Sequence, residues 1–357
     1  MATGNAIQAS KDIFLRDYTS SGHKNFSTVS FASEQPSFLA QDGYFLARLK
    51  GKLYRDGDPT WQDVNSTAIQ ALNALCDKQN SDGSWNDPNM DPDPRATGPC
   101  VWALSLGAKV LALDSATAQR YKDAVREGAD WLVQFWDNWN APIDDDYYTS
   151  PNQLGLTLMG LSEAYRWGYT SNNYNFPAKM QSYGDALTTL QNQNPANNGL
   201  WRNGSRNNRP DHQPNGTGDG YEVYMVYEMW TMQGDAIYAM NRDNLTPPST
   251  PSSQYWTDAR ECCAKIWDVR STYGYYPKEM DQYGNPLECS THANPSNPPR
   301  AYAEVTPISW GYYSAAFRQA VSDCGGTRKM CEQYHFHLGI NGLSGGMYWE
   351  IDNLLLY

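Results

Sequence analysis

Residues 121–139, YKDAVREGADWLVQFWDNW, are followed after a loop by residues 153–167, QLGLTLMGLSEAYRW, and the contrast between them decides the fold. The first stretch places Val125, Ala129 and Leu132 at helical spacing and leaves charges between them, so it predicts a helix with one buried face. The second stretch is apolar on nearly every side, so it predicts a helix that is buried all round. Together they indicate an outer helix that covers an inner one.

This alternation continues in both directions along the chain. We expect amphipathic helices over 66–78, 179–191, 255–269 and 328–338, and more apolar helices over 100–113, 220–232 and 306–321. We find no strand ladder and no dinucleotide or phosphate loop in the sequence. The pattern predicts an all-α (α/α) toroid, or barrel, of about six or seven helix pairs. We expect residues 1–357 to form one catalytic domain with a polar N-terminal arm over residues 1–35.

The connections that lead from an outer to an inner helix are mostly the longer ones. Several end in a glycine-aromatic phrase, such as Gly83-Ser-Trp85 and Gly199-Leu-Trp201. In a toroid these connections emerge on one face, because each helix pair runs in the same direction. Loops rich in aromatic, amide and charged residues on one face predict a cleft there.

The composition favours a protein that handles sugars. The chain has 13 Trp and 25 Tyr with only 18% charged residues, and sugar rings stack on aromatic planes while amides pair with hydroxyls. The formal net charge of -12 argues against nucleic acid and against an anionic membrane surface. No apolar run is long enough for a transmembrane helix. We expect a secreted monomer, and glycosylation sequons begin at Asn25, Asn65, Asn203, Asn215 and Asn244.

The seven cysteines contain no C-x-x-C pair, so a zinc or thioredoxin-type site is not expected. Cys324 and Cys331 flank a turn and could form a disulfide, and Cys76 with Cys100 is a second candidate pair. We expect no metal and no cofactor.

Two loops concentrate groups suited to an anionic sugar. Residues 201–222 read WRNGSRNNRPDHQPNGTGDGYE and gather three arginines in an otherwise acidic chain, and residues 289–304 hold His292, Arg300 and Tyr302. β-Elimination on a uronate needs the C6 carboxylate neutralised, the C5 proton removed and the leaving oxygen protonated. Arg, Asn, His or a protonated Glu can neutralise the carboxylate, and Tyr with or without His can move the protons. These loops therefore favour a lyase.

The phrase Arg300-Ala-Tyr-Ala-Glu304, which leads into the apolar Ser314-Ala-Ala-Phe317, is similar to the inner-helix start of α/α-toroid alginate lyases. The size, acidity and loop layout most resemble polysaccharide lyase family 38, the helical-barrel alginate and glucuronan lyases. The resemblance implies that Tyr302 transfers protons. It also implies an Asn/His pair at an earlier inner helix, for which residues 207–212, NNRPDH, are an imperfect counterpart.

The sequence thus predicts a secreted, endo-acting lyase that takes an anionic polysaccharide, an alginate-like or glucuronan-like chain. Arg300, Glu222 and Asn215 would bind or neutralise the carboxylate. His212 and Tyr302 would handle the protons, with His292 as the alternative histidine. The expected lining of the sugar subsites comprises Trp85, Trp201, Tyr148, Arg206, Arg209, Asn152 and Tyr221.

Three other functions fit parts of the sequence. An inverting glycoside hydrolase would use paired carboxylates from Asp144, Asp145, Asp146, Asp91, Asp93, Glu222 and Glu228. A terpene-cyclase-like toroid is suggested by Gln79-x-x-x-Gly83-x-Trp85. A non-catalytic glycan-binding protein is the remaining alternative, and mutation of Tyr302 would leave its glycan binding unchanged.

Overall fold

The computed structural model describes most of the N-terminal three quarters of the chain. The described residues are 35–86, 91–139, 143, 151–194, 196–201, 223–243, 253–273, 279–280 and 283–285, with Gln8, Lys11, Asp12, Phe14, Leu15, Tyr18 and Thr19 before them. The expected helices at 306–321 and 328–338 lie outside these residues.

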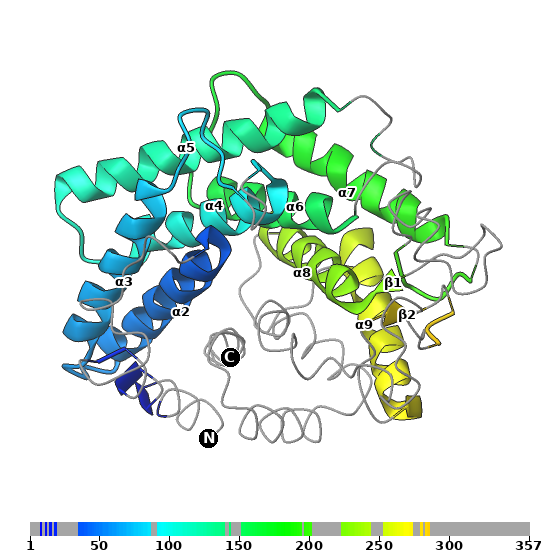
Figure 1. The fold of residues 1–357 in the computed structure, drawn as a ribbon, viewed down its shortest axis with the longest axis horizontal. Helices are drawn as coiled ribbons and strands as arrows, with labels where there is room; N and C mark the ends of the chain where they lie inside the picture. The colour runs from blue at the N-terminus through cyan, green and yellow to red at the C-terminus, as the bar shows by residue number, and fades with distance from the viewer. Residues whose placement is uncertain are drawn as a thin grey trace.

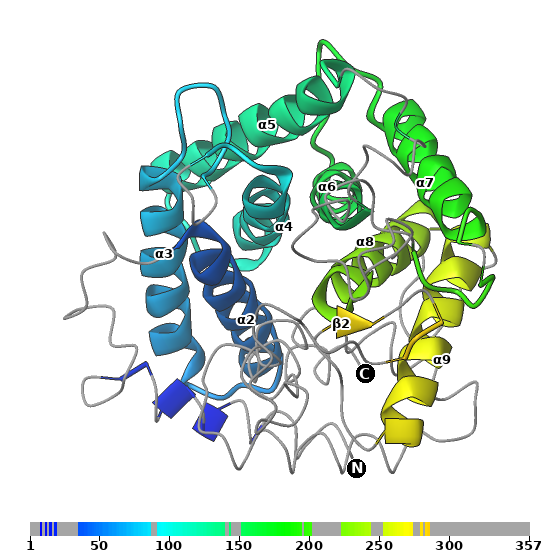
Figure 2. The ribbon, with the colours of Figure 1, turned by 45° about the vertical axis from the view of Figure 1, so that its right-hand side comes forward.

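The described helices form an inner and an outer layer that alternate along the chain. The inner layer consists of α2 (Pro36–Arg55), α4 (Pro94–Val110), α6 (Pro151–Arg166) and α8 (Met225–Arg242). The outer layer consists of α3 (Trp61–Asp77), α5 (Ser115–Asp137), α7 (Phe176–Asn192) and α9 (Gln254–Tyr273). Figures 1 and 2 show the outer helices arranged in an arc around the inner ones. The predicted (α/α) toroid class is confirmed.

Burial follows the predicted contrast between the two layers. In α6 every residue from Pro151 to Ala164 is buried, whereas α5 buries one face and exposes the other. Continuous burial of an apolar helix requires neighbours on all sides, and α6 packs against α4, α5, α7 and α8. The inner wall is therefore the core of the molecule.

The inner helices run parallel and approach closely. Tyr44 of α2 stacks on Trp102 of α4, with ring centroids 3.5 Å apart, and each lies midway along its helix. Between α4 and α6, a Cβ atom on Gly160 would lie 2.7 Å from the carbonyl oxygen of Gly98. Glycine is needed here because no larger residue fits at this backbone separation.

Helix α2 was not predicted, and α4 begins earlier than expected. The predicted start at Cys100 followed Pro99, but α4 continues through that proline and starts at Pro94. Asp93 caps the helix by accepting a hydrogen bond from the Arg95 amide, and proline is favoured at the first helical position. The other predicted helices that fall within the described residues are confirmed with bounds that differ by up to six residues, except that α8 begins at Met225 and extends to Arg242.

A tryptophan corner joins α3 to α4. The Trp85 indole nitrogen donates to the Leu75 carbonyl oxygen over 2.8 Å. The Gln79 amide donates to the carbonyl oxygens of Gly83 and Ala124, both over 2.9 Å, and so ties the loop to α5. Gly83 has φ +92°, a left-handed conformation that favours glycine.

A second tryptophan corner repeats this construction between α7 and α8. The Trp201 indole nitrogen donates to the Leu187 carbonyl oxygen over 2.9 Å. The Gln191 amide donates to the carbonyl oxygens of Gly199 and Asp258, over 2.7 and 3.0 Å. The Gln-Gly-Trp pattern that suggested a terpene-cyclase-like toroid is thus a packing device used twice in this fold.

The long connections lie at one end of the helices, as predicted. Inner-to-outer connections span residues 56–60, 111–114, 167–175 and 243–253, whereas outer-to-inner connections span 78–93, 138–150 and 193–224. Among the described residues the only strands are β1 (Val223–Tyr224) and β2 (Glu279–Met280), which pair antiparallel at the entry to α8. No strand ladder was expected, and this pair is two residues long.

Parts of the N-terminal arm pack on the barrel. Phe14 and Tyr18 are buried, and the Tyr18 hydroxyl donates to the buried Asp42 carboxylate of α2 over 2.7 Å. These described positions of the arm therefore contribute to the core.

The described cysteines and the described sequon asparagine, Asn65, are buried in the protein and belong to its core. Cys76 and Cys100 are free buried thiols, so the candidate disulfide between them is wrong, and burial raises the pKa of Cys76 to about 12. The buried Asn65 amide bonds the Ala112 backbone in both directions, so this sequon is not an accessible glycosylation site. No helix in the described ranges has the length and apolarity needed to cross a bilayer.

Candidate functional site

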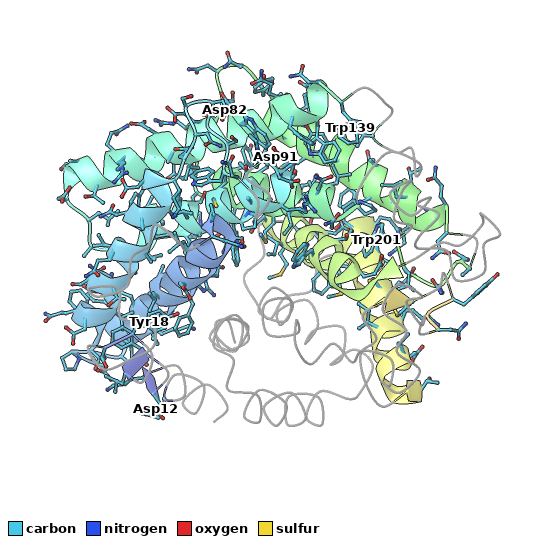
Figure 3. The ribbon with its side chains drawn as sticks, in the orientation of Figure 1. Asp12, Tyr18, Asp82, Asp91, Trp139 and Trp201 are labelled. Carbon is cyan, nitrogen blue, oxygen red and sulfur yellow. The ribbon has the colours of Figure 1, made fainter. Side chains whose placement is uncertain are left out.

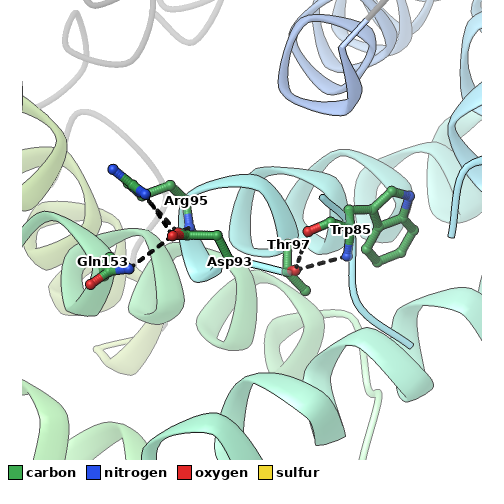
Figure 4. Close-up of polar contacts among 5 residues, drawn as sticks. All are labelled: Trp85, Asp93, Arg95, Thr97 and Gln153. Atoms are coloured by element: carbon green, nitrogen blue, oxygen red, sulfur yellow. Dashed lines mark hydrogen bonds and ion pairs between the residues drawn. The ribbon is translucent and has the colours of Figure 1, made fainter. Parts of the chain in front are cut away.

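A polar cluster lies where two inner helices begin, at the end of the fold that has the long connections. It joins Asp93 and Arg95 at the start of α4 to Gln153 in the first turn of α6 (Figure 4). Asp93 precedes Pro94, whose fixed φ favours a helix start, so the local sequence sets the direction of both charged side chains.

The Asp93 carboxylate is engaged by four donors. Its Oδ1 atom accepts from the Arg95 amide over 2.7 Å and from Arg95 Nε over 3.0 Å. Its Oδ2 atom accepts from Arg95 Nη2 over 2.7 Å and from Gln153 Nε2 over 3.0 Å. This fork geometry fixes the guanidinium plane. The Arg95 side chain keeps 21% of its surface exposed, so part of an oriented guanidinium group, paired with Asp93, reaches solvent at this end.

The cluster is linked to the first tryptophan corner through Thr97. The Trp85 amide donates to Thr97 Oγ1 over 3.0 Å, and the Thr97 hydroxyl donates to the Trp85 carbonyl oxygen over 3.4 Å (Figure 4). Both residues are buried. The chain that enters α4 is therefore held rigidly, which preorganises Arg95.

A buried carboxyl group occupies the second corner. Glu228 of α8 is fully buried, and its Oε2 atom accepts from the Trp201 amide over 2.8 Å and contacts Cys262 Sγ of α9 at 3.6 Å. Burial raises the pKa of Glu228 to about 8. Neutral Glu228 is therefore the main form below that pH.

A further carboxyl group is buried on α8. Asp235 is fully buried, and neither oxygen has a hydrogen-bond partner among the described residues. Burial first, and then the charge of Asp258, raise the pKa of Asp235 well above its usual range. A carboxyl group in such surroundings is held in its neutral form.

The structure corrects the predicted role of the two tryptophans. Trp85 and Trp201 are completely buried, and each indole N–H is bonded inside the core, so neither ring can stack on a sugar. Figure 3 shows Trp201 beside α8. Asn152, the third predicted subsite residue that is described, is also fully buried, so its predicted direct contact with sugar is wrong in this structure.

The other predicted site residues lie outside the described residues. These are Tyr302, His212, Arg300, Glu222, His292, Asn215, Arg206, Arg209, Tyr148 and Tyr221. Their roles stay predictions. Arg95 and Gln153 were not among the predicted site residues; the sequence signal for Arg95 was the Asp-Pro-Arg phrase at the start of a helix.

The acids proposed for a hydrolase are used in different ways. Asp93 is a helix cap held by Arg95, and Glu228 is enclosed in the core. Asp91 is exposed near the start of α4 (Figure 3). Asp144, Asp145 and Asp146 lie outside the described residues. Within the described part of the chain, no group of three His, Cys, Asp or Glu residues is arranged to hold a metal ion.

Comparison with known proteins supports the fold. No protein-family model and no curated protein matches the sequence. A family 88 glycosyl hydrolase from Bacteroides vulgatus has a similar structure, with a TM-score of 0.59, 11% identity and 98% of each chain covered.

Two further solved structures are similar. A polysaccharide lyase has a TM-score of 0.58 and 10% identity, and the match covers 100% of this chain and 97% of the lyase. An unsaturated glucuronyl hydrolase specific for heparin has a TM-score of 0.57 and 11% identity, with 100% of this chain and 95% of that chain covered. At these identities the likeness shows the (α/α) toroid fold alone.

Proposed function

We propose that this protein is a polysaccharide lyase that cleaves a uronate polymer by β-elimination. The observation that carries the proposal is the orientation of Arg95 at the N-terminal end of α4, next to the first turn of α6. A guanidinium fixed by a carboxylate fork and reachable from solvent suits the carboxylate of a uronate residue. The three similar structures belong to proteins whose names describe a lyase and hydrolases, including a glucuronyl hydrolase.

Two of the acids considered for an inverting hydrolase have other roles in the described part of the chain. A hydrolase of that kind needs one acid to protonate the leaving oxygen and one carboxylate to activate water. Asp93 already accepts four hydrogen bonds, and Glu228 is completely buried. Neither is placed to act on a glycosidic bond.

In the proposed reaction, Arg300, Glu222 and Asn215 bind the C6 carboxylate and stabilise charge that develops beside C5. His212, or His292 in its place, removes the C5 proton with the help of Tyr302. The electron pair of the C5–H bond forms the C4–C5 double bond, and the C4–O bond breaks. Tyr302 protonates the departing oxygen. Arg95 would bind the carboxylate of a neighbouring sugar.

Ultraviolet absorbance separates the candidate reactions. The protein is incubated with alginate, with glucuronan and with a neutral glycan as control. A lyase raises the absorbance of the unsaturated product on a uronate polymer only, and new reducing ends without absorbance indicate a hydrolase. When the substrate is an unsaturated oligosaccharide, a fall in absorbance indicates an unsaturated glucuronyl hydrolase. Binding without bond cleavage would leave the glycan-binding alternative.

Variants assign the roles within the proposed site. Tyr302→Phe should abolish product formation and leave polymer binding intact; full activity would remove Tyr302 from the reaction. Arg95→Gln should raise KM on the polymer by about tenfold, the equivalent of one charge-assisted hydrogen bond of roughly 1.4 kcal/mol. Unchanged KM would show that Arg95 is only structural.

A further inference from the structure

The capping carboxylate of α4 accepts more hydrogen bonds than a helix cap requires. At the start of α5, Asp114 caps the helix by accepting from the Thr117 amide over 2.7 Å. At the start of α4, Asp93 Oδ1 accepts from the Arg95 amide, also over 2.7 Å, which is the equivalent capping bond. The second oxygen of Asp93, Oδ2, takes no part in this cap, so its partners need another explanation.

This second oxygen joins two inner helices. It accepts from Arg95 Nη2 of α4 over 2.7 Å and from Gln153 Nε2 of α6 over 3.0 Å (Figure 4). Asp93 and Arg95 are neighbours on one chain, so rotation about the side-chain bonds of Asp93 could carry the guanidinium group with it. Gln153 lies 60 residues further along the chain, and its bond to Oδ2 opposes that rotation from a second helix.

Gln153 is itself held from the outer layer of helices. Its backbone carbonyl oxygen accepts from Thr157 Oγ1 over 2.9 Å, and Thr157 Oγ1 accepts from Trp136 Nε1 of α5 over 2.9 Å. The side chains of Gln153, Thr157 and Trp136 are buried. A buried series of hydrogen bonds therefore leads from α5 through the first turns of α6 to Asp93, and such support locks the orientation of the group that it reaches.

We propose that Gln153 is a positioning residue, which holds Asp93 so that Arg95 keeps one orientation toward the carboxylate of a uronate residue. The inference rests on the proposed function, in which Arg95 binds such a carboxylate. Gln153 keeps 3% of its surface exposed, so it acts through Asp93 and Arg95 rather than on the polymer. The donors of a guanidinium group lie in one plane, and rotation of that plane weakens its pairing with a carboxylate.

A double-mutant cycle tests whether Gln153 acts through Arg95. Gln153→Met removes the donor to Asp93 and keeps a side chain of similar length. We expect this variant to raise KM for the uronate polymer about threefold, with a smaller change in kcat, as for residues coupled in one hydrogen-bond network. Added to Arg95→Gln, the same substitution should raise KM no further. An equal rise in both backgrounds, or no rise in either, would overturn the proposal.

Ser162→Ala is the matched control for a loss of stability in α6. Ser162 is buried near the other end of this helix, and its hydroxyl donates to the Met159 carbonyl oxygen over 3.3 Å. The control variant should lower the unfolding free energy and leave KM at the wild-type value. A rise in KM as large as that of Gln153→Met would show that KM follows the stability of α6, and the positioning role would be wrong.

Side-chain NMR gives a readout that needs no activity. The Arg95 Nε–H group, which donates to Asp93 Oδ1 over 3.0 Å, is assigned as the signal that Arg95→Gln lacks. Its proton should exchange with solvent about tenfold faster in Gln153→Met than in the wild type, and at the wild-type rate in Ser162→Ala. Equal rates in Gln153→Met and the wild type would refute the positioning role. Faster exchange in a protein that cleaves no uronate polymer would instead refute the proposed function and leave the positioning of Arg95 standing.

Discussion

Replacement of Trp85 by phenylalanine tests the assignment of the tryptophans to the core. The indole N–H donates to the Leu75 carbonyl oxygen over 2.8 Å, and the ring is completely buried. The lost hydrogen bond leaves a buried acceptor at a cost of about 1–2 kcal/mol. Loss of about 40 Å³ of side chain at ~24 cal/mol per Å³ adds about 1 kcal/mol, so the unfolding free energy should fall by about 2–3 kcal/mol.

Urea denaturation followed by linear extrapolation measures this loss, and an unchanged m-value shows that two-state unfolding is retained. Trp139→Phe is the matched control, because the Trp139 indole nitrogen has no acceptor among the described residues. It should cost less than Trp85→Phe by the value of the hydrogen bond. A Trp85→Phe variant of wild-type stability, with a raised KM for polymer, would refute the core assignment and restore the role in sugar stacking.

Other residues give predictions of the same kind. Gln79→Leu leaves the carbonyl oxygens that accept from its amide without that donor and should lower the unfolding free energy by about 1–3 kcal/mol in urea. Gly98→Ala places a Cβ against the Leu156 carbonyl oxygen of α6 and should cost about 1–3 kcal/mol, whereas Gly51→Ala, with open space around it, should stabilise α2 by about 0.5–1 kcal/mol; thermal unfolding distinguishes the two. Asp235 has a raised pKa when folded, so the folded state binds the extra proton and stability falls as pH rises above the unfolded value. Asp235→Asn should flatten that fall between pH 5 and 8 in melting temperature measured against pH, and an unchanged slope would contradict the neutral state.

Helix type was predictable because it depends on local periodicity. The spacing of apolar residues alone indicates that α6 is buried on all sides and that α5 is amphipathic, with one buried face. Helix α2 was not predicted because two of its buried residues, Asp42 and Lys50, are charged, and charged residues normally indicate a solvent-exposed face. Asp42 is satisfied by Tyr18, and Lys50 donates to the Val110 carbonyl oxygen over 2.7 Å. Such partners are distant in sequence.

The site was harder to predict for the same physical reason. Tryptophan can cover a sugar or fill a core, and the choice at Trp85 and Trp201 depends on carbonyl groups at the ends of α3 and α7 that only the fold brings near. The contact between Arg95, Asp93 and Gln153 requires α4 and α6 to begin side by side. A single sequence contains no signal for that arrangement.

The parallel inner helices also shape the electric field of the molecule. Aligned peptide dipoles give each helix start roughly half a positive charge. Asp93 and Glu228 lie at the starts of α4 and α8, whereas α2 and α6 carry no acidic residue in their first turns. The starts of α2 and α6 are therefore positive helix ends that no first-turn carboxylate offsets. These two positive ends would attract the uronate polymer that we propose as the substrate.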